Sequence, residues 1–135
     1  MSEPVWIKKS ALVLAHTQAL MKHGGPAGLR DDGLLESALA RPRNLYAYES
    51  ISDICRLAVS YAAGILRNHP FVDGNKRAAF VALSMFLDLN GIRLTANPKE
   101  AADIFFKAAA GELNEEEDLT AWVFKNSAAE GKEKA

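Results

Sequence analysis

Residues 54–89 read ICRLAVSYAAGILRN, HPFVDGNKR and AAFVALSMFLDL, two long apolar segments joined by a short polar one. Apolar residues recur in both outer segments at helical spacing, which predicts a pair of buried helices. We expect the first helix to be capped by Ser52 and to end at residues 68–70. The second should begin at Asn75 and end at residues 90–91. Because it is apolar nearly all round, it should be the central helix.

The N-terminal part of the chain carries further helical patterns. A helix over residues 10–22 should stop at the Gly-Gly-Pro sequence that follows it. The next should begin at Asp31 or Asp32 and end at residues 41–42, because a residue before proline is disfavoured in helical geometry. Residues 42–50 are then expected to form an ordered loop.

The C-terminal part predicts two more helices, over residues 98–110 and 115–126, with Asn114 as the N-cap of the latter. Strand-like alternation is confined to short pieces near residues 5–7 and 92–95. The predicted fold class is therefore mainly α, a compact helical bundle with a central apolar helix and a minor short β element.

The length of 135 residues fits one domain. We expect residues 1–127 to form a single domain and residues 128–135 to fray as a small, charged tail. Because no apolar run approaches the roughly 20 residues that cross a bilayer and no secretory signal opens the chain, we expect a soluble, cytoplasmic protein with no membrane partner. The single cysteine, Cys55, suits a reducing compartment and is expected to be a small core residue.

The net charge of −1 and the pI near 6.3 give no overall attraction for nucleic acid, so direct binding of DNA or RNA is disfavoured. The acidic run of residues 115–118 is expected to open a helix, whose dipole favours negative charge at that end.

The polar segment of residues 69–77 concentrates the groups of a phosphate-transfer site. A helix that starts at Asn75, directly after a turn at Gly74, directs unpaired backbone N–H groups at an anion. Lys76 and Arg77 in its first turn add positive charge for phosphate oxygens, and Asn75 can add a neutral hydrogen bond. Asp73 beside these cations makes sense as a ligand of Mg²⁺ that also binds phosphate.

His69 stands four residues before Asp73, and Pro70 restricts the turn between them. An imidazole titrates near neutral pH, so His69 could take the proton from an attacking hydroxyl. Each of these residues alone has an ordinary structural interpretation as a cap, a turn or a surface charge. We favour function for the set because all of them fall in one short window. The other histidines, His16 and His23, are expected to pack or to cap their helix.

The same window resembles the signature His-Pro-Phe-x-Asp/Glu-Gly-Asn-x-Arg of the Fic/Doc family, and residues 69–77 match it without a gap. Residues 24–31 and 33–42 and the Asn-Gly pair at 90–91 are similar to the death-on-curing (Doc) branch of that family. The likeness extends from about residue 4 to residue 125.

The resemblance implies a compact helical fold, His69 as the base, Asp73 as the Mg²⁺ ligand, and Gly74, Asn75 and Arg77 as the residues that bind nucleotide phosphates. Two positions differ from typical AMP-transferring members. This chain has Lys76 where they have glycine, and Phe80 where they have a second arginine. The second arginine of those members holds the far phosphate while the α-phosphate is attacked, so its absence disfavours AMP transfer.

The Asn-Lys-Arg form of residues 75–77 is shared with Doc-type toxins. It implies a protein kinase that moves the γ-phosphate of ATP to a threonine of elongation factor Tu, inhibits translation and is neutralised by a Phd-like antitoxin. In that orientation Lys76 assists the transferred group. Two alternatives stay open, a Fic-type transferase of AMP or UMP and a non-catalytic module that binds nucleotide or a partner.

Many Fic proteins inhibit themselves with a helix of the form Ser/Thr-x-x-x-Glu-Gly/Asn. Residues 130–131 read Glu-Gly, but the position four before the Glu holds Asn126, and Ser127 is one residue out of register. We interpret this as a chance near-match, so the resemblance implies inhibition by a separate antitoxin.

Overall fold

The computed structural model describes residues 3–114 and 116–129, and this part of the chain is mainly helical, as predicted. Each predicted helix has a counterpart, and a small antiparallel sheet completes the fold. The elements are α1 (Lys9–His23), α2 (Asp32–Glu49), α3 (Ile54–Asn68), α4 (Asn75–Leu89), β1 (Ile92–Leu94), α5 (Pro98–Ala109), α6 (Glu117–Lys125) and β2 (Ser127–Ala129).

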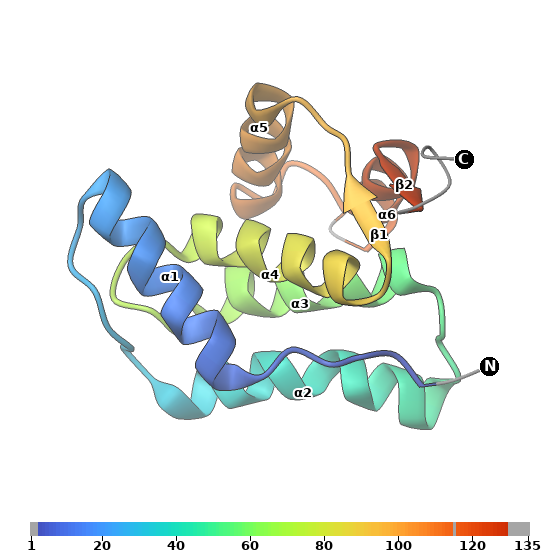
Figure 1. The fold of residues 1–135 in the computed structure, drawn as a ribbon, viewed down its shortest axis with the longest axis horizontal. Helices are drawn as coiled ribbons and strands as arrows, with labels where there is room; N and C mark the ends of the chain where they lie inside the picture. The colour runs from blue at the N-terminus through green and yellow to red at the C-terminus, as the bar shows by residue number, and fades with distance from the viewer. Residues whose placement is uncertain (1–2, 115, 130–135) are drawn as a thin grey trace.

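α3 and α4 run side by side through the middle of the molecule, with α1 and α2 on one side and α5, α6 and the sheet on the other (Figure 1). α4 is central, as its composition predicts, but it shares that position with α3. Residues 57–66 of α3 are buried without interruption. The two central helices are therefore closely packed, and they hold both ends of the loop that joins them.

α2 continues through Pro42 to Glu49, so the predicted helix end at residues 41–42 and the ordered loop over residues 42–50 are wrong. The proline lacks an N–H for the helical ladder, yet Pro42 is buried. α2 also packs closely on α3, where a Cβ atom at Gly64 would lie 3.1 Å from Cα of Ala38. Burial along this contact outweighs the local preference against helix before proline.

The N-cap of α3 is Asp53 and not Ser52. The Asp53 side chain accepts a hydrogen bond of 3.0 Å from the backbone N–H of Cys55. Both residue types are favoured N-caps, and the sequence pattern misplaced the helix start by one position. Cys55 is buried, which confirms the expectation of a core residue.

Residues 5–7 do not form the predicted strand, because side chains pair with their backbone groups. Asn90 accepts a hydrogen bond from the N–H of Val5 and donates one to its carbonyl oxygen, at 2.8 and 3.0 Å. The hydroxyl of Tyr61 accepts a bond of 3.2 Å from the N–H of Ile7. The segment is thus held to the core without a partner strand.

β1 is instead paired with β2, in the register Ile92 with Ala129 and Leu94 with Ser127. The expectation of a loose tail is therefore wrong for residues 128–129, whereas residues 130–135, with the Glu-Gly pair, lie outside the described residues. The division into a domain of residues 1–127 and a tail stays a prediction.

α6 begins at Glu117, later than the predicted start at residue 115, and Glu116 directly before it provides no side-chain cap. Asn114, the predicted N-cap, lies two residues before Glu116 and still pairs with the start of the helix. The Asn114 side chain accepts a hydrogen bond from the backbone N–H of Glu117 at 2.9 Å. The backbone N–H of Asn114 donates to the Asp118 carboxylate at 2.8 Å. This reciprocal pair satisfies two backbone donors.

Glu116 of the acidic run has a different role. Its carboxylate forms ion pairs with Arg41 of α2 at 2.7 Å and with Arg56 of α3 at 3.2 Å, and so ties the start of α6 to two other helices.

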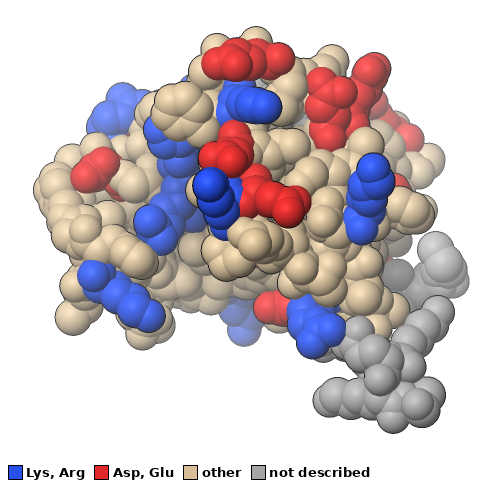
Figure 2. Space-filling model, turned by 90° about the horizontal axis from the view of Figure 1, so that it is seen from above, with Lys and Arg blue, Asp and Glu red and all other residues tan. Residues whose placement is uncertain are grey.

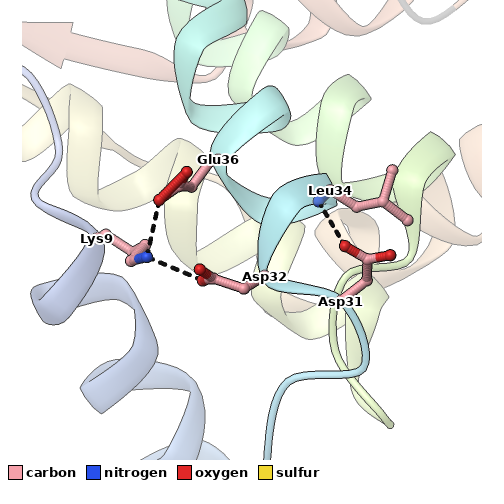
Figure 3. Close-up of polar contacts among 5 residues, drawn as sticks. All are labelled: Lys9, Asp31, Asp32, Leu34 and Glu36. Atoms are coloured by element: carbon pink, nitrogen blue, oxygen red, sulfur yellow. Dashed lines mark hydrogen bonds and ion pairs between the residues drawn. The ribbon is translucent and has the colours of Figure 1, made fainter.

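The beginnings of α1 and α2 are joined by Lys9, which forms ion pairs with Asp32 at 2.9 Å and Glu36 at 3.1 Å (Figure 3). The hydrogen bond to Asp32, then that to Glu36, raises the pKa of Lys9 above its ordinary value. Asp31 caps α2 by accepting a hydrogen bond from the N–H of Leu34 at 3.0 Å (Figure 3). These contacts fix the C-terminal end of the α1–α2 connection, where α2 begins.

Acidic and basic side chains are interspersed over the face seen in Figure 2, which fits the near-zero net charge. Among the residues that the structure describes, none of the helices is long and apolar enough to cross a membrane.

Candidate active site

The loop of residues 69–74 joins α3 to α4 at the same end of the molecule as the connection between α1 and α2 (Figure 1). His69 closes α3 in the left-handed backbone region, with φ of 47°, and its N–H donates to the Ile65 carbonyl at 3.0 Å. Gly74 precedes α4 with φ of 73°, which glycine adopts without steric cost. The predicted turn at Gly74 and helix start at Asn75 are thus confirmed.

The positive φ of His69 costs on the order of 1 kcal/mol and persists only where surrounding contacts hold it. Those contacts come from the segment before α2. The guanidinium of Arg30 donates to the carbonyl oxygens of His69 at 2.7 Å and Asn68 at 2.8 Å. The backbone N–H of Arg30 donates to the Pro70 carbonyl at 2.7 Å, and Leu29 pairs with Phe71 in an antiparallel bridge. The first half of the loop is therefore fixed by a segment that lies far away in the sequence.

The underside of the loop rests on His16 of α1, which is 1% exposed. The imidazole stacks on the buried ring of Phe71, with centroids 3.8 Å apart and an interplanar angle of 22°. Its Nε2 lies 2.8 Å from the carbonyl oxygen of Asp73. Packing was the expected role of His16, and this is confirmed, but the contact with the loop is a role that the sequence did not reveal.

The side chain of Asn75 is used within the loop. Its Oδ1 accepts a hydrogen bond from the N–H of Phe71 at 3.0 Å, and its Nδ2 donates to the Phe71 carbonyl at 3.0 Å. Nδ2 also lies 3.4 Å from Nδ1 of His69. Because an amide N–H₂ only donates, the imidazole Nδ1 accepts in this contact. The expected bond from this side chain to phosphate is not available in this arrangement, and the N–H of Asn75 is the group left for a ligand.

Asp73 is exposed, and its Oδ1 accepts a hydrogen bond from the N–H of Gly74 at 2.8 Å. Its carboxylate is in none of the ion pairs within the described part of the chain. A Cβ atom at Gly25 would lie 2.7 Å from Oδ2, so the backbone before α2 approaches the carboxylate closely. Asp73 thus keeps oxygen lone pairs for a cation, as its proposed role requires.

The first turn of α4 has no side-chain cap. Ala78 is the first residue whose N–H donates into the helix, to the Gly74 carbonyl at 2.8 Å. Within the described residues, the backbone N–H groups of Asn75, Lys76 and Arg77 donate to no loop carbonyl and to no side chain. Unpaired amides at a helix N-terminus form a site for anions.

Lys76 and Arg77 are exposed and line a groove of about 670 Å³ between α4 and the β1–α5 region. The ammonium of Lys76 lies 5.0 Å from the centroid of the Phe106 ring, within range of a cation–π contact. Both cations thus stand beside the uncapped amides, on the side of α4 that faces α5.

Phe80 stands where, by the resemblance, AMP-transferring members have a second arginine. Its ring packs edge-on against Phe105 of α5, with centroids 5.5 Å apart. The position is part of the apolar contact between α4 and α5 and offers no charge to a phosphate.

The structure therefore brings His69, Asp73, Gly74 and Asn75 together in one loop, with Lys76 and Arg77 at its helical edge. Three residues that support this loop were not predicted from the sequence. Arg30 binds the carbonyls of Asn68 and His69, His16 binds the carbonyl of Asp73, and Gly25 leaves room for the Asp73 carboxylate. The Gly-Gly pair at residues 24–25 was a signal, although it predicted only a helix end.

The donor set suits a cation that phosphate helps to hold. Among the described residues, no group of three His, Cys, Asp or Glu side chains could bind a metal ion by itself. Asp73 offers a carboxylate oxygen next to the anion-binding amides. Mg²⁺ in nucleotide sites is typically bound by one or two carboxylates together with phosphate oxygens and water, so the residues present fit such an ion.

Comparison with known proteins agrees with this geometry. The model of the Fic/DOC family matches residues 6–87. The chain is 33% identical over 108 residues to the protein kinase doc of Escherichia phage P1, across 80% of this chain and 85% of that protein. It is 38% identical over 82 residues to the toxin Doc of Mycolicibacterium smegmatis, across 60% of this chain and 63% of that toxin. All the candidate loop residues lie within the family match.

Proposed function

Because the chain belongs to the Fic/Doc family, we propose that it is a Doc-type toxin, a protein kinase that transfers the γ-phosphate of ATP to a protein hydroxyl. The names of its two relatives, protein kinase doc and toxin Doc, support this proposal. The observation that carries it is the loop itself, where an exposed imidazole and a carboxylate that has no ion pair among the described residues flank unpaired amides. These are the groups that phosphoryl transfer requires.

In this proposal every residue of the loop has a defined task. The backbone amides of Asn75, Lys76 and Arg77 bind the oxygens of the phosphate. The positively charged side chains of Lys76 and Arg77 neutralise the charge of the phosphate. Asp73 would hold Mg²⁺, which supplies further neutralisation of the phosphate charge when bound. Lys76 can leave the Phe106 ring to reach the transferred group, since its side chain is exposed.

His69 would take the proton of the acceptor hydroxyl. The contact with Asn75 favours the His69 tautomer that has its lone pair on Nδ1, so Nδ1 accepts the proton of the hydroxyl. The contact of 3.4 Å is at the long end of hydrogen bonding, and the incoming hydroxyl displaces it at little cost.

For the acceptor we propose a threonine of elongation factor Tu, so that transfer inhibits translation in the cytoplasm. The deciding experiment incubates the chain with elongation factor Tu and ATP labelled separately at the α and γ positions. We expect only the γ label on the target, and mass spectrometry of its fragments should locate one phosphorylated threonine. The α label on the target would overturn the kinase proposal and favour AMP transfer.

A specific observation weighs against AMP transfer. That reaction in typical family members uses a second arginine to hold the far phosphate, and here Phe80 is committed to packing on Phe105. The remaining alternative, a non-catalytic binding module, is tested by expressing the wild type and His69→Ala in cells. Growth arrest by the wild type alone supports catalysis, whereas equal arrest by both variants supports binding.

We propose that a Phd-like antitoxin neutralises the chain. The near-match to an inhibitory motif involves residues that have other contacts. Asn126 donates to the Trp122 carbonyl at 2.9 Å, and Ser127 is paired in the sheet. Co-expression of a Phd-like antitoxin should restore growth. If the antitoxin is without effect while the catalytic variant is harmless, the toxin is controlled in another way.

A further inference from the structure

We propose that His16 is a positioning residue of this site, which orients the Asp73–Gly74 peptide so that the carboxylate and the α4 amides face the same ligand. This inference rests on the proposed function. It assigns a task to a buried imidazole that lies 57 residues away from its partner in the sequence.

The direction of the hydrogen bond follows from the atoms. Nε2 of His16 lies 2.8 Å from the Asp73 carbonyl oxygen, which only accepts, so Nε2 carries the hydrogen and donates. The other ring nitrogen, Nδ1, is buried and has no partner in the described structure. Among the described residues, the hydrogen bond to the Asp73 carbonyl is therefore the polar contact of the His16 imidazole.

One peptide unit connects this bond to the site. The carbonyl of Asp73 and the N–H of Gly74 belong to the same planar, trans unit and point in opposite directions. A carbonyl that is held inward by His16 therefore directs the N–H outward, where Oδ1 of Asp73 accepts it at 2.8 Å. The buried ring fixes the plane of the peptide, and the plane fixes the carboxylate.

Close packing keeps the peptide in this orientation. A Cβ atom at Gly74 would lie 3.2 Å from Nε2 of His16 and 3.1 Å from Cδ2 of Leu20, so the backbone touches α1 there. The stack of His16 on Phe71 fixes the ring itself. α1 therefore supports the loop, and it does so by placing the Nε2–H donor of His16 beside the Asp73 carbonyl.

The test separates the N–H donor from the ring. His16→Phe keeps the ring and its stack but removes the donor, whereas His16→Gln removes the ring but keeps an amide N–H at a similar reach. His16→Asn carries the same amide one methylene too short. His23→Gln is the matched control, because His23 ends the same helix and is exposed.

Three quantities should be measured for each variant, namely the melting temperature, the Kd for a non-hydrolysable ATP analogue with Mg²⁺, and the hydrogen exchange and chemical shift of the Gly74 amide. We expect His16→Phe and His16→Asn to weaken the Mg²⁺-dependent binding by about tenfold, as for other groups that orient a metal ligand. Both should also alter the Gly74 amide. His16→Gln and His23→Gln should stay close to the wild type.

The inference is overturned if folded His16→Phe or His16→Asn binds as tightly as the wild type, or if the glutamine and asparagine variants behave alike. Should His16→Phe not fold, the glutamine and asparagine pair decides the question alone. Failure of the proposed function has a different signature. If the kinase proposal fails, the target carries the α label or no label while the comparison of Kd values among the variants still stands, and if the site takes no nucleotide at all, the wild type itself does not bind the analogue. If the wild type binds no nucleotide, an unchanged Gly74 amide in the folded variants would still refute the positioning role.

Discussion

Nε of Arg30 donates a hydrogen bond of 2.7 Å to the carbonyl oxygen of His69, so a residue from the α1–α2 connection closes the C-terminus of α3. Its Nη2 does the same for the carbonyl of Asn68 at 2.8 Å. The last carbonyls of a helix lack intrahelical partners and carry partial negative charge. One guanidinium thus caps α3 and holds the backbone of the candidate base.

Replacing Arg30 with glutamine should lower the free energy of unfolding by about 1 kcal/mol, because Arg30 is exposed and water partly replaces its bonds. Urea denaturation measures this change. Phosphate transfer should fall further than the stability loss explains, since His69 loses its anchor. Lys99→Gln, at an exposed position on α5, is the control. Equal activity of the two variants would contradict the anchoring role.

Removing the charge of Asp73 should abolish Mg²⁺-dependent transfer. Asp73→Asn is the sharpest variant, because its amide oxygen still accepts the bond from the Gly74 N–H and the loop is preserved. Transfer of labelled phosphate across a Mg²⁺ titration tests this expectation. Asp103→Asn removes an exposed carboxylate from α5 and should change nothing. Unchanged activity of Asp73→Asn over the titration would rule out Asp73 as the metal ligand.

Gly64→Ala should destabilise the protein although alanine is the better helix former. The new methyl group would lie 3.1 Å from Cα and Cβ of Ala38 in α2, and a backbone atom moves aside only if the two helices separate. Overpacking costs about 1–3 kcal/mol, and the helical gain from alanine is at most about 1 kcal/mol. The net loss, about 1 kcal/mol, is measurable by urea denaturation. An increase in stability would show that α2 can shift freely.

Glu116→Gln should loosen the attachment of α6. The change removes the carboxylate shared by Arg41 and Arg56, whose side chains are 33% and 19% exposed. Two partly buried guanidinium groups would then lack a counter-ion, at a cost of about 1 kcal/mol that salt reduces. Thermal melts at low and high salt measure the effect. Glu117→Gln, at the exposed neighbouring position, is the control, and an equal loss there would point to a general charge effect.

Cys55 should be a slow nucleophile. Burial, more than any other cause, raises the pKa of its thiol, and the hydrogen bond to Ser127 opposes that rise. Since a raised pKa leaves less thiolate at any given pH, alkylation should require a higher pH than it does for glutathione. The rate of reaction with iodoacetamide as a function of pH provides the test. Rapid labelling of the folded protein at neutral pH would contradict the buried environment.

The sequence predicted the helices well wherever apolar spacing and caps agreed, as for α1, α4 and α5. It failed where packing between distant segments outweighed a local rule. Pro42 was expected to end α2, but contact with α3 keeps the helix intact. Residues 5–7 have the alternation of a strand, yet the Asn90 side chain takes the place of a strand partner.

The candidate site was predictable in part because its main residues are consecutive. Order along the chain was enough to place His69, Asp73 and Gly74 in one turn. Their supports were not predictable, because Arg30 lies 39 residues before His69 and His16 lies 57 residues before Asp73. A single sequence gives no sign that a helical histidine and a loop carbonyl will meet.

α4 begins without a cap of its own, and this has a consequence for how the protein withstands heat. Its leading amides are left for an outside anion to pair with, so a nucleotide would complete the helix that the polypeptide leaves unfinished. A ligand at a hundred times its Kd adds about 2.7 kcal/mol to the folded state. The melting temperature should then serve as a gauge of how full the site is, and heat tolerance would follow the supply of nucleotide around the protein.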